Sequence, residues 1–369
     1  MPFPRLVSFP ILTVFVSCAS SLQPVPETWL SVPAAPAISR EQLRRAVAET
    51  TPARRGEAAP AGAAEERVAI VTDESGARLF RGKTPLTPPY GAIESFDVSL
   101  ERREVIFSAR RVESFDIGLV SLDGSGVNWV PEDPADELAP RWAPRGNKAS
   151  FILRTAAGDL IRTVHIPTAV QLVVEFPFGL VRDFVWDGPA ERFAVSWESA
   201  EAAPRIEVMR YGGEERRLAV PPAVRLDVDV APFAGGLLLR PGSVSYGEKL
   251  PLVIWVSPGS RNAWNDARAA LLQSSRVAAL VVDRPPDAAV LAAIEEAGWV
   301  DRRRLYLVDP AGTSPPPAGV RTIRADPSVP PRHFRRDANV MLVDPSVVQS
   351  FAARFIADQL KGTSPSGHR

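Results

Sequence analysis

The chain has 369 residues, of which 45% are hydrophobic, so it is long enough for two ordinary domains with packed cores. Lysine plus arginine and aspartate plus glutamate number 43 each, and this balance gives no basic surplus for a nucleic-acid partner. The single cysteine excludes an internal disulfide and, in an exported chain, needs its own explanation.

The first residues have the pattern of an export signal. Met1–Arg5 carries one positive side chain, and Leu6–Val16 is an apolar run well short of the ~20 residues that cross a bilayer as a helix. Ser17 then places a small residue directly before the only cysteine, Cys18. This stretch resembles the lipobox of bacterial lipoproteins, with Phe15 where that family usually has leucine.

The lipobox resemblance implies that residues 1–18 form a lipoprotein signal and that acyl chains such as palmitate are attached to Cys18. Two or three acyl chains anchor a protein stably, whereas one chain alone is marginal. Ala19 is not the aspartate associated with inner-membrane retention, so we expect the periplasmic face of the outer membrane rather than of the inner one. The alternative is an ordinary secretory signal cut near Ala19-Ser20, which discards Cys18.

Residues 19–65 predict a disordered tether. Prolines recur there among alanine, glutamate and arginine, a composition that cannot bury enough surface to order itself. Within this segment, Ser39 followed three residues later by Gln42 is typical of a helix start, and Leu43 and Val47 share one helix face. We interpret this short helix as transient.

From about residue 66 to residue 235, short alternating runs between turn residues indicate β-strands. A phrase made of an aromatic residue, a polar turn and an apolar strand recurs, and its aromatic residues Phe96, Trp142 and Phe184 are spaced by 46 and then 42 residues. Such a period, with several strands in each repeat, is typical of propeller blades. The three copies are Ser95–Phe107, Ala139–Phe151 and Arg182–Phe193.

The second copy, Ala139-Pro-Arg-Trp-Ala-Pro-Arg-Gly-Asn-Lys-Ala-Ser-Phe151, resembles the repeat of WD-repeat-like periplasmic propellers. That repeat occurs in the Tol-system propeller protein and in the propeller halves of prolyl-oligopeptidase-like enzymes. The resemblance implies that Trp142 packs between blades. The region holds only about four blades at this period, fewer than those enzymes carry. We therefore expect a small or incomplete β-propeller, or an open β-array.

Residues 236–361 alternate apolar strands with helices, which predicts a largely parallel sheet covered on both faces. We expect strands at residues 251–256, 277–282, 304–308, 320–323 and 339–343, helices at 267–273, 287–297 and 346–360, and a tail at 362–369.

This second module also resembles the hydrolase domain of prolyl-oligopeptidase-like enzymes. Gly236–Pro241 leading to Leu250–Gly259 is similar to the entry of that domain, and Ala293–Leu307 is similar to the approach to its nucleophile elbow. The resemblance covers roughly residues 130 to 360. It implies a mixed β and α/β fold class, with a reduced, mostly parallel α/β-hydrolase-like sheet after the propeller.

The catalytic motif of that family is degenerate here. The elbow requires Gly-x-Ser-x-Gly, whereas the chain has Asp309-Pro-Ala-Gly-Thr313, so Ala311 stands in the place of the nucleophile. The His-Gly-Gly oxyanion segment is replaced by Ser257-Pro-Gly259. Asp326 loosely resembles the acid, and Val343-Asp-Pro345 stands where the family has its histidine. The resemblance therefore implies a framework without its triad.

Other nucleophiles are conceivable, because Ser257, Ser260 and Ser314 lie near expected strand ends. Nothing in the sequence places His333 within reach of them, as a serine nucleophile requires. No phosphate loop, dinucleotide fingerprint or metal-ligand cluster occurs, so we expect no cofactor.

We interpret the chain as an anchored, catalytically inactive relative of prolyl-oligopeptidase-like proteins that binds or scaffolds an envelope protein or peptide. One alternative is a serine hydrolase, a peptidase or esterase, with a displaced nucleophile such as Ser257 or Ser314. Another is a purely structural lipoprotein.

Overall fold

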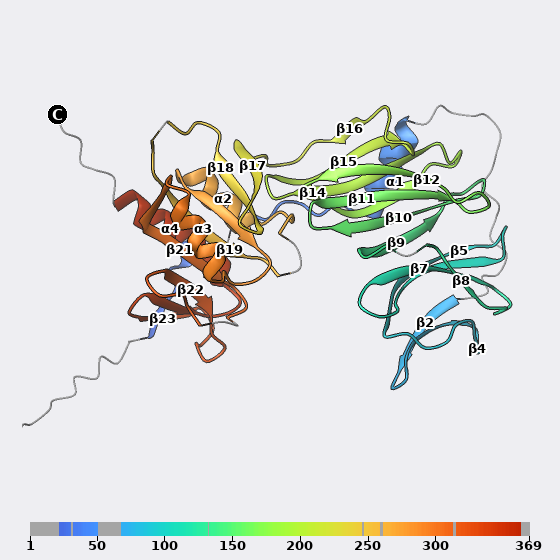
Figure 1. Cartoon of the computed structure of the whole chain (residues 1–369), viewed down its shortest axis with the longest axis horizontal. Coiled ribbons are helices and arrows are strands. Elements are labelled where there is room, and N and C mark those ends of the chain that lie inside the picture. Colours follow the sequence, from blue (N-terminus) through green and yellow to red (C-terminus); the bar gives the residue numbers. More distant parts are fainter. Residues whose placement is uncertain are drawn as a thin grey trace, which may run out of the picture.

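The computed structural model describes residues 22–30, 32–50, 68–131, 133–245, 247–258, 261–312 and 315–362. Figure 1 shows two lobes, a stack of small sheets and a lobe of one large sheet with helices. The predicted signal with Cys18 and residues 363–369 of the tail lie outside the described residues. Within the described ranges, no helix combines the length and apolar character needed to span a membrane.

The described residues between 68 and 220, here called the four-sheet module, form four antiparallel sheets in chain order. Their number matches the four repeats expected from the sequence period. The first sheet has β2 (Val68–Asp73), β3 (Gly76–Arg81) and β4 (Thr84–Pro85). The second has β5 (Ala92–Ser99), β6 (Glu104–Arg110), β7 (Phe115–Ser121) and β8 (Val127–Trp129). The third has β9 (Asp136–Trp142), β10 (Lys148–Thr155), β11 (Gly158–His165) and β12 (Val170–Pro177), and the fourth has β13 (Gly179–Trp186), β14 (Arg192–Ser199), β15 (Ala202–Arg210) and β16 (Arg217–Val220).

Apolar side chains join each sheet of this module to the next. Leu79 of the first sheet packs with Phe107 of the second, and Phe151 of the third packs with Ile106 of the second. Phe176 and Phe193 join the third sheet to the fourth. As predicted, Trp142 is buried between two sheets. The mostly β architecture is therefore compatible with a propeller-like domain.

The second module, here called the large-sheet module, contains a nine-stranded sheet. The strands β20, β19, β21, β22 and β24 lie side by side in parallel, and antiparallel strands flank them on both sides. In spatial order the sheet runs β1 (Leu22–Pro24), β23 (His333–Asp337), β24 (Val340–Val343), β22 (Arg321–Ala325), β21 (Val300–Asp309), β19 (Leu250–Val256), β20 (Ala278–Val282), β18 (Gly236–Pro241) and β17 (Val228–Phe233).

Helices cover both faces of the large sheet. On one face, α2 (Asp266–Ser274) and α4 (Val348–Gly362) pack against Trp255, and on the other face α3 (Ala288–Glu296) buries Ile294. The three helices lie where the sequence pattern predicts them. Asn265 and Asp287 cap the first turns of α2 and α3 by accepting backbone N–H bonds, as short polar residues do at helix starts.

The boundary between the modules differs from the expected one at residues 235 and 236. There Ala234 and Gly235 both have positive φ, at 48° and 75°, as a tight two-residue hairpin turn requires. The turn joins β17 to β18, so β17 belongs to the large sheet rather than to the propeller-like region. The four-sheet module therefore ends with β16.

The two modules contact each other through apolar packing and hydrogen bonds. Ala200, in the turn after β14, packs in one cluster with Ala269 of α2 and Leu237 of β18. The Trp264 N–H donates to Glu198 Oε1 at 3.1 Å, and fully buried Arg268 donates to the carbonyl of Ala200 at 3.4 Å. The segment after β19 therefore packs directly against the four-sheet module.

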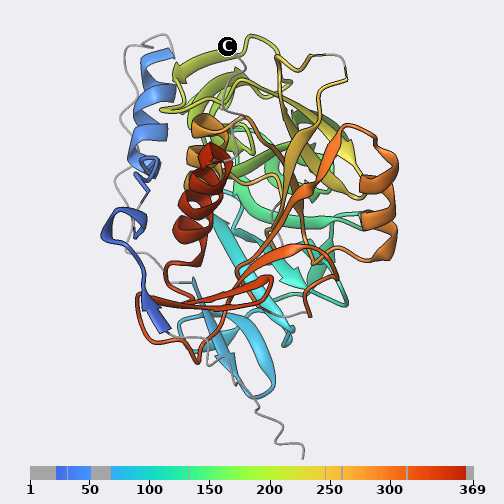
Figure 2. The ribbon, with the colours of Figure 1, turned by 90° about the vertical axis from the view of Figure 1, so that its left-hand side faces the viewer.

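The expectation of a disordered tether over residues 19–65 is wrong for the described residues 22–30 and 32–50, here called the strap. The strap adds β1 to the edge of the large sheet and places Trp29 of η1 (Glu27–Trp29) against Phe351 and Phe355 of α4. It then forms α1 (Arg40–Thr50) on the fourth small sheet. Figure 2 shows the strap, in dark blue, running past both modules.

The predicted helix start at Ser39 and Gln42 is present, but the helix is packed rather than transient. The Ser39 backbone N–H and hydroxyl both donate to Gln42 Oε1. Leu43 and Val47 are buried against Ala194, Ile206 and Val208 on the outer face of the fourth sheet. In this stack of sheets, α1 therefore covers the face on which a fifth sheet would otherwise pack.

Candidate functional site

The three copies of the repeated phrase converge on one pocket of about 440 Å³ in the four-sheet module. Phe96, Trp142 and Phe184 lie on β5, β9 and β13, the first strands of three successive sheets. The strap contributes two arginines from α1. The pocket is lined by Arg40, Arg44, Ile70, Ser95, Phe96, Asp97, Arg141, Trp142, Pro144, Phe184, Val185 and Trp186.

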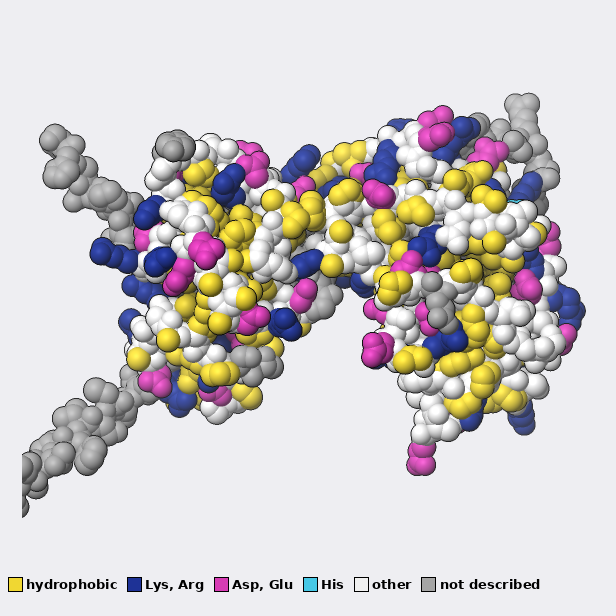
Figure 3. Space-filling view, in the orientation of Figure 1, with side chains coloured by type: hydrophobic (Ala, Val, Ile, Leu, Met, Phe, Trp, Pro, Cys, Tyr) yellow, Lys and Arg dark blue, Asp and Glu magenta, His cyan; other side chains and the backbone are white. Residues whose placement is uncertain are grey.

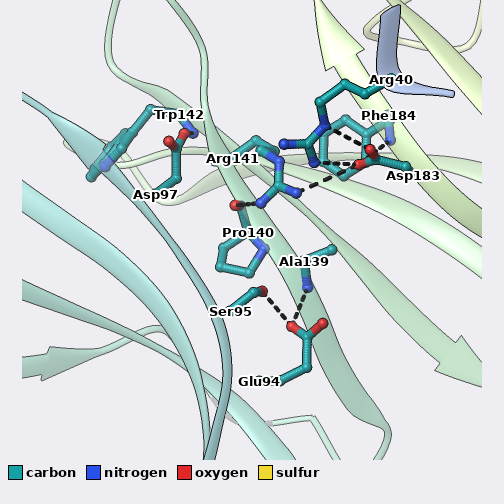
Figure 4. A network of polar contacts seen from close by, with 10 residues as sticks. All are labelled: Arg40, Glu94, Ser95, Asp97, Ala139, Pro140, Arg141, Trp142, Asp183 and Phe184. Atoms are coloured by element: carbon teal, nitrogen blue, oxygen red, sulfur yellow. Dashed lines mark hydrogen bonds and ion pairs between the residues drawn. The ribbon is translucent and has the colours of Figure 1, made fainter. Parts of the chain in front are cut away.

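Acidic residues of β5 bind the backbone of the next sheet beside this pocket. Asp97 Oδ2 accepts the Trp142 N–H at 2.8 Å, and Glu94 Oε2 accepts the Ala139 N–H at 3.0 Å (Figure 4). Each of these pairs is separated by 45 residues, which is one repeat. These carboxylate hydrogen bonds therefore join β5 and β9, the first strands of two neighbouring sheets.

Asp183 of β13 holds two arginines at the pocket wall. Arg40 binds it in a bidentate pair, Nε to Oδ2 at 2.7 Å and Nη2 to Oδ1 at 2.9 Å. Arg141 Nη2 lies 3.5 Å from Asp183 Oδ1 (Figure 4). The hydrogen bond that Arg40 donates to Asp183 raises the pKa of Arg40 above its ordinary value. The Arg40–Asp183 ion pair links α1 of the strap to β13, the first strand of the fourth sheet.

The pocket combines positive charge with an apolar wall. Burial raises the pKa of the Asp97 carboxyl above its ordinary value, and the Trp142 N–H and Arg141 lower it in part. Among the described residues, Arg44 forms an ion pair with Glu41 at 3.7 Å, and both side chains are exposed. Three arginines and Asp97 thus line the pocket together with four aromatic residues, and two of the arginines, Arg40 and Arg141, are paired with Asp183. Such a lining suits an anionic group attached to an apolar one.

The carboxyl edge of the large sheet carries the positions that the sequence resemblance to hydrolases singles out. Ser257 follows β19, Ala311 follows β21 and Asp326 follows β22, and these strands run parallel side by side. Carboxyl ends of parallel strands are the usual site edge of such a sheet. The fold therefore places these three positions along one edge, as the resemblance implies.

The turn after β21 differs from a nucleophile elbow. Asp309 Oδ1 accepts the N–H groups of Ala311 and Gly312, both at 3.1 Å. The left-handed residue is Gly312, with φ at +65°, where an added Cβ would lie 2.4 Å from the Ala325 carbonyl oxygen. No helix follows in the described residues 315–320, whereas an elbow leads from strand to helix. The turn presents the methyl group of Ala311 rather than a nucleophile.

The described histidine of the large-sheet module, His333, begins β23 at the same carboxyl edge, where its carbonyl accepts the Asp344 N–H at 3.1 Å. His333 is on β23, and its Nδ1 is 2.8 Å from the Pro331 carbonyl oxygen. Strand β23 lies four strand positions from β19, about 19 Å at the ~4.8 Å spacing of a sheet. His165 contacts Thr168 in the four-sheet module. Asp326 accepts hydrogen bonds from Ser328, which lower the pKa of its carboxyl. Ser260 and Ser314 lie outside the described residues.

A second pocket, of about 420 Å³, lies at the same carboxyl edge. Its described lining holds no histidine. Val32 of the strap is part of its wall, and the Ala35 N–H donates to Asp266 Oδ1 at 2.9 Å. The strap therefore lies along the carboxyl edge of the large sheet at this pocket. Across the described chain, no three histidine, cysteine, aspartate or glutamate side chains group as metal ligands would.

Sequence reasoning identified the aromatic residues of the first pocket as repeat residues but not as a site. It missed Arg40 and Arg44, because both stand in a segment whose composition predicts disorder. The helix start at Ser39 was the available signal for these arginines. It predicts α1, but it does not indicate that α1 packs on the fourth sheet.

No family model matches the chain, and no curated protein matches it. Among solved structures, it is similar to prolyl oligopeptidase B from Galerina marginata, at 10% identity and a TM-score of 0.51, over 70% of this chain and 48% of that one. It is also similar to a prolyl endopeptidase structure from a study of two such enzymes, at 12% identity and a TM-score of 0.51, over 68% of this chain and 45% of that one. A Pyrococcus horikoshii acylaminoacyl peptidase matches at 13% identity with a TM-score of 0.48, over 65% of this chain and 46% of that one. The chain spans less than half the length of these enzymes, and over about two thirds of its own length it has a fold similar to that of prolyl oligopeptidases.

Proposed function

We propose that the chain is a non-catalytic binding protein, held at the cell envelope by acylation of Cys18, and that its ligand site is the aromatic and arginine-lined pocket of the four-sheet module. The observation that carries the proposal is the convergence of Phe96, Trp142 and Phe184, one from each repeat, on a pocket that also receives arginines from the strap.

The proposal includes descent from an α/β-hydrolase-like ancestor that has lost its triad. It is supported by Ala311 after β21, by the Asp309-capped turn, and by the four strand positions that separate β23, which carries His333, from β19, which leads to Ser257. The strap over the second pocket supports it further, because it occupies the approach to that edge.

The lining favours a ligand with a carboxylate beside an apolar or aromatic group, such as the carboxyl-terminal end of a peptide from an envelope protein. Guanidinium groups bind carboxylates through charge-assisted hydrogen bonds, and aromatic walls bind apolar side chains. Arg44 and Arg141 border the pocket, and Trp142 and Trp186 supply rings together with a fluorescence signal.

An acetylated tripeptide ending in phenylalanine, used as free acid and as amide, tests the proposal by titration with tryptophan fluorescence and calorimetry. We expect the acid to bind about tenfold more tightly than the amide, because hydrogen bonds to charged groups contribute about 1.5–3 kcal/mol. Arg44→Ala and Arg141→Ala are each expected to weaken binding of the acid by a similar factor and to leave binding of the amide unchanged.

Arg45→Ala is the matched control, since Arg45 is an exposed residue of α1 outside the pocket lining. It is expected to keep the affinity of the unmodified chain. Equal binding of acid and amide, or equal losses in Arg44→Ala and Arg45→Ala, would refute the carboxylate site.

A further inference from the structure

The edge of the large sheet formed by β1 and β23 begins a few residues after the predicted anchor. Leu22, the first residue of β1, is four Cα steps from Cys18, so about 14 Å is the largest distance between them at ~3.5 Å per residue. Leu22 pairs with Arg335 and Pro24 pairs with His333, which fixes β1 on β23 (Figure 2). An acylated Cys18 would therefore hold this edge close to the lipid headgroups.

This edge is rich in arginine. Arg332 and Arg336 are exposed, and the Arg335 side chain is 37% exposed, with Asp326 at 3.8 Å. Among the described residues, β1 pairs with residues 333–335 of β23. Over residues 321–344 the chain has five arginines and three aspartates, and the adjoining part of the strap, residues 22–30, adds one acid, Glu27. This leaves an excess of one positive charge near the predicted anchor.

An apolar residue lies beside these charges. Leu22 is 50% exposed and, as the strand partner of Arg335, lies on the same face of the sheet. An arginine and an exposed leucine on one face of the sheet, next to an acyl anchor, suit a surface with anionic headgroups over an apolar layer. Charged side chains on a sheet edge can also serve to prevent pairing with the edge of another chain. A direct binding test distinguishes this role of the arginines from lipid binding.

We propose that the β1–β23 edge rests on the membrane in the anchored protein and that Arg332, Arg335 and Arg336 bind anionic lipid headgroups. The inference rests on the acylation of Cys18 in the function proposed above. It orients the molecule, because the edge lies in the large-sheet module, and the ligand pocket belongs to the four-sheet module, which forms the other lobe (Figure 1, Figure 3).

Vesicle sedimentation with the mature chain carrying Cys18→Ser tests the edge without the anchor. We expect this chain to bind vesicles of phosphatidylcholine mixed with phosphatidylglycerol, to bind poorly to phosphatidylcholine alone, and to lose binding as salt is raised. The double variant Arg332→Gln/Arg336→Gln is expected to lower the partition coefficient by about 25-fold, or about fivefold for each arginine near an anionic surface.

The control variant Arg216→Gln/Arg217→Gln removes the same charge from exposed residues at β16 in the other lobe, and it is expected to change binding little. No preference for anionic vesicles, or equal losses in the two double variants, would overturn the inference. Near-ultraviolet circular dichroism of each variant checks that the fold is retained.

Mass spectrometry of the chain extracted from the envelope tests Cys18 separately. A chain without acyl groups would overturn the proposed anchor and the membrane placement together. An acylated chain whose Cys18→Ser form shows no anionic preference would overturn only the role of the β1–β23 edge.

Discussion

Leu43→Ala is expected to lower the free energy of unfolding of the four-sheet module by about 2–5 kcal/mol, the range for removing a buried leucine side chain. Leu43 is 1% exposed and packs with Ala194, Ile206 and Val208. Its loss weakens the only helix that covers the outer face of the fourth sheet in the described chain. Urea denaturation followed by tryptophan fluorescence measures the change.

The same variant is expected to weaken binding of the tripeptide acid, because α1 carries Arg40 and Arg44 into the pocket. Arg45→Ala, on the exposed face of α1, is the control and is expected to stay within about 0.5 kcal/mol of the unmodified chain. If Leu43→Ala denatured at the same urea concentration as Arg45→Ala, α1 would not be a structural part of the stack.

A pH dependence is expected from Glu137, a buried carboxyl between the second and third sheets. Its Oε2 accepts the Ile117 N–H at 3.0 Å and its Oε1 lies 3.5 Å from Arg162 Nη1. Burial raises the pKa of Glu137 to about 7 from 4.5. The folded state therefore holds this proton more tightly than the unfolded state. Its contribution is full below pH 4.5 and is lost as the pH rises to about 7, a loss of about 3 kcal/mol at 1.36 kcal/mol per pKa unit.

Glu137→Gln is expected to remove that slope, since glutamine keeps an acceptor for the Ile117 N–H and does not titrate. Free energies of unfolding measured between pH 4.5 and 7 in both chains give the comparison. The matched control is Glu175→Gln, at an exposed position of β12, which is expected to leave the slope unchanged. An unmodified chain that gains stability over this pH range, with the gain abolished by Glu137→Gln, would contradict the assignment.

The repeat and the strand–helix alternation were readable from the sequence because both arise from local periodicity. The repeated motif around Phe96, Trp142 and Phe184 marks the first strands of three sheets. Each apolar run of the second half forms a buried strand. That residues 309–313 do not match Gly-x-Ser-x-Gly was also readable, because such a match depends on residue identity alone. The structure adds that the turn there is capped by Asp309.

The strap and the module boundary were not readable, because both depend on contacts between distant residues. Arg40 binds Asp183, 143 residues away, and no composition rule reveals such a partner. Strand β17 alternates like a propeller strand, so only its pairing with β18 assigns it to the large sheet. Likewise, β23 was not among the expected strands, and it is ordered by pairing with β24 and β1.

The central claim, that this hydrolase-like framework has no working nucleophile, is tested most directly by labelling the purified mature chain with a fluorophosphonate probe. The account predicts no labelling of a well-folded sample, because Ala311 replaces the elbow serine and β23, which carries His333, lies about 19 Å from β19, which leads to Ser257. Labelling that is lost in Ser257→Ala or Ser314→Ala would contradict it and would identify a displaced nucleophile.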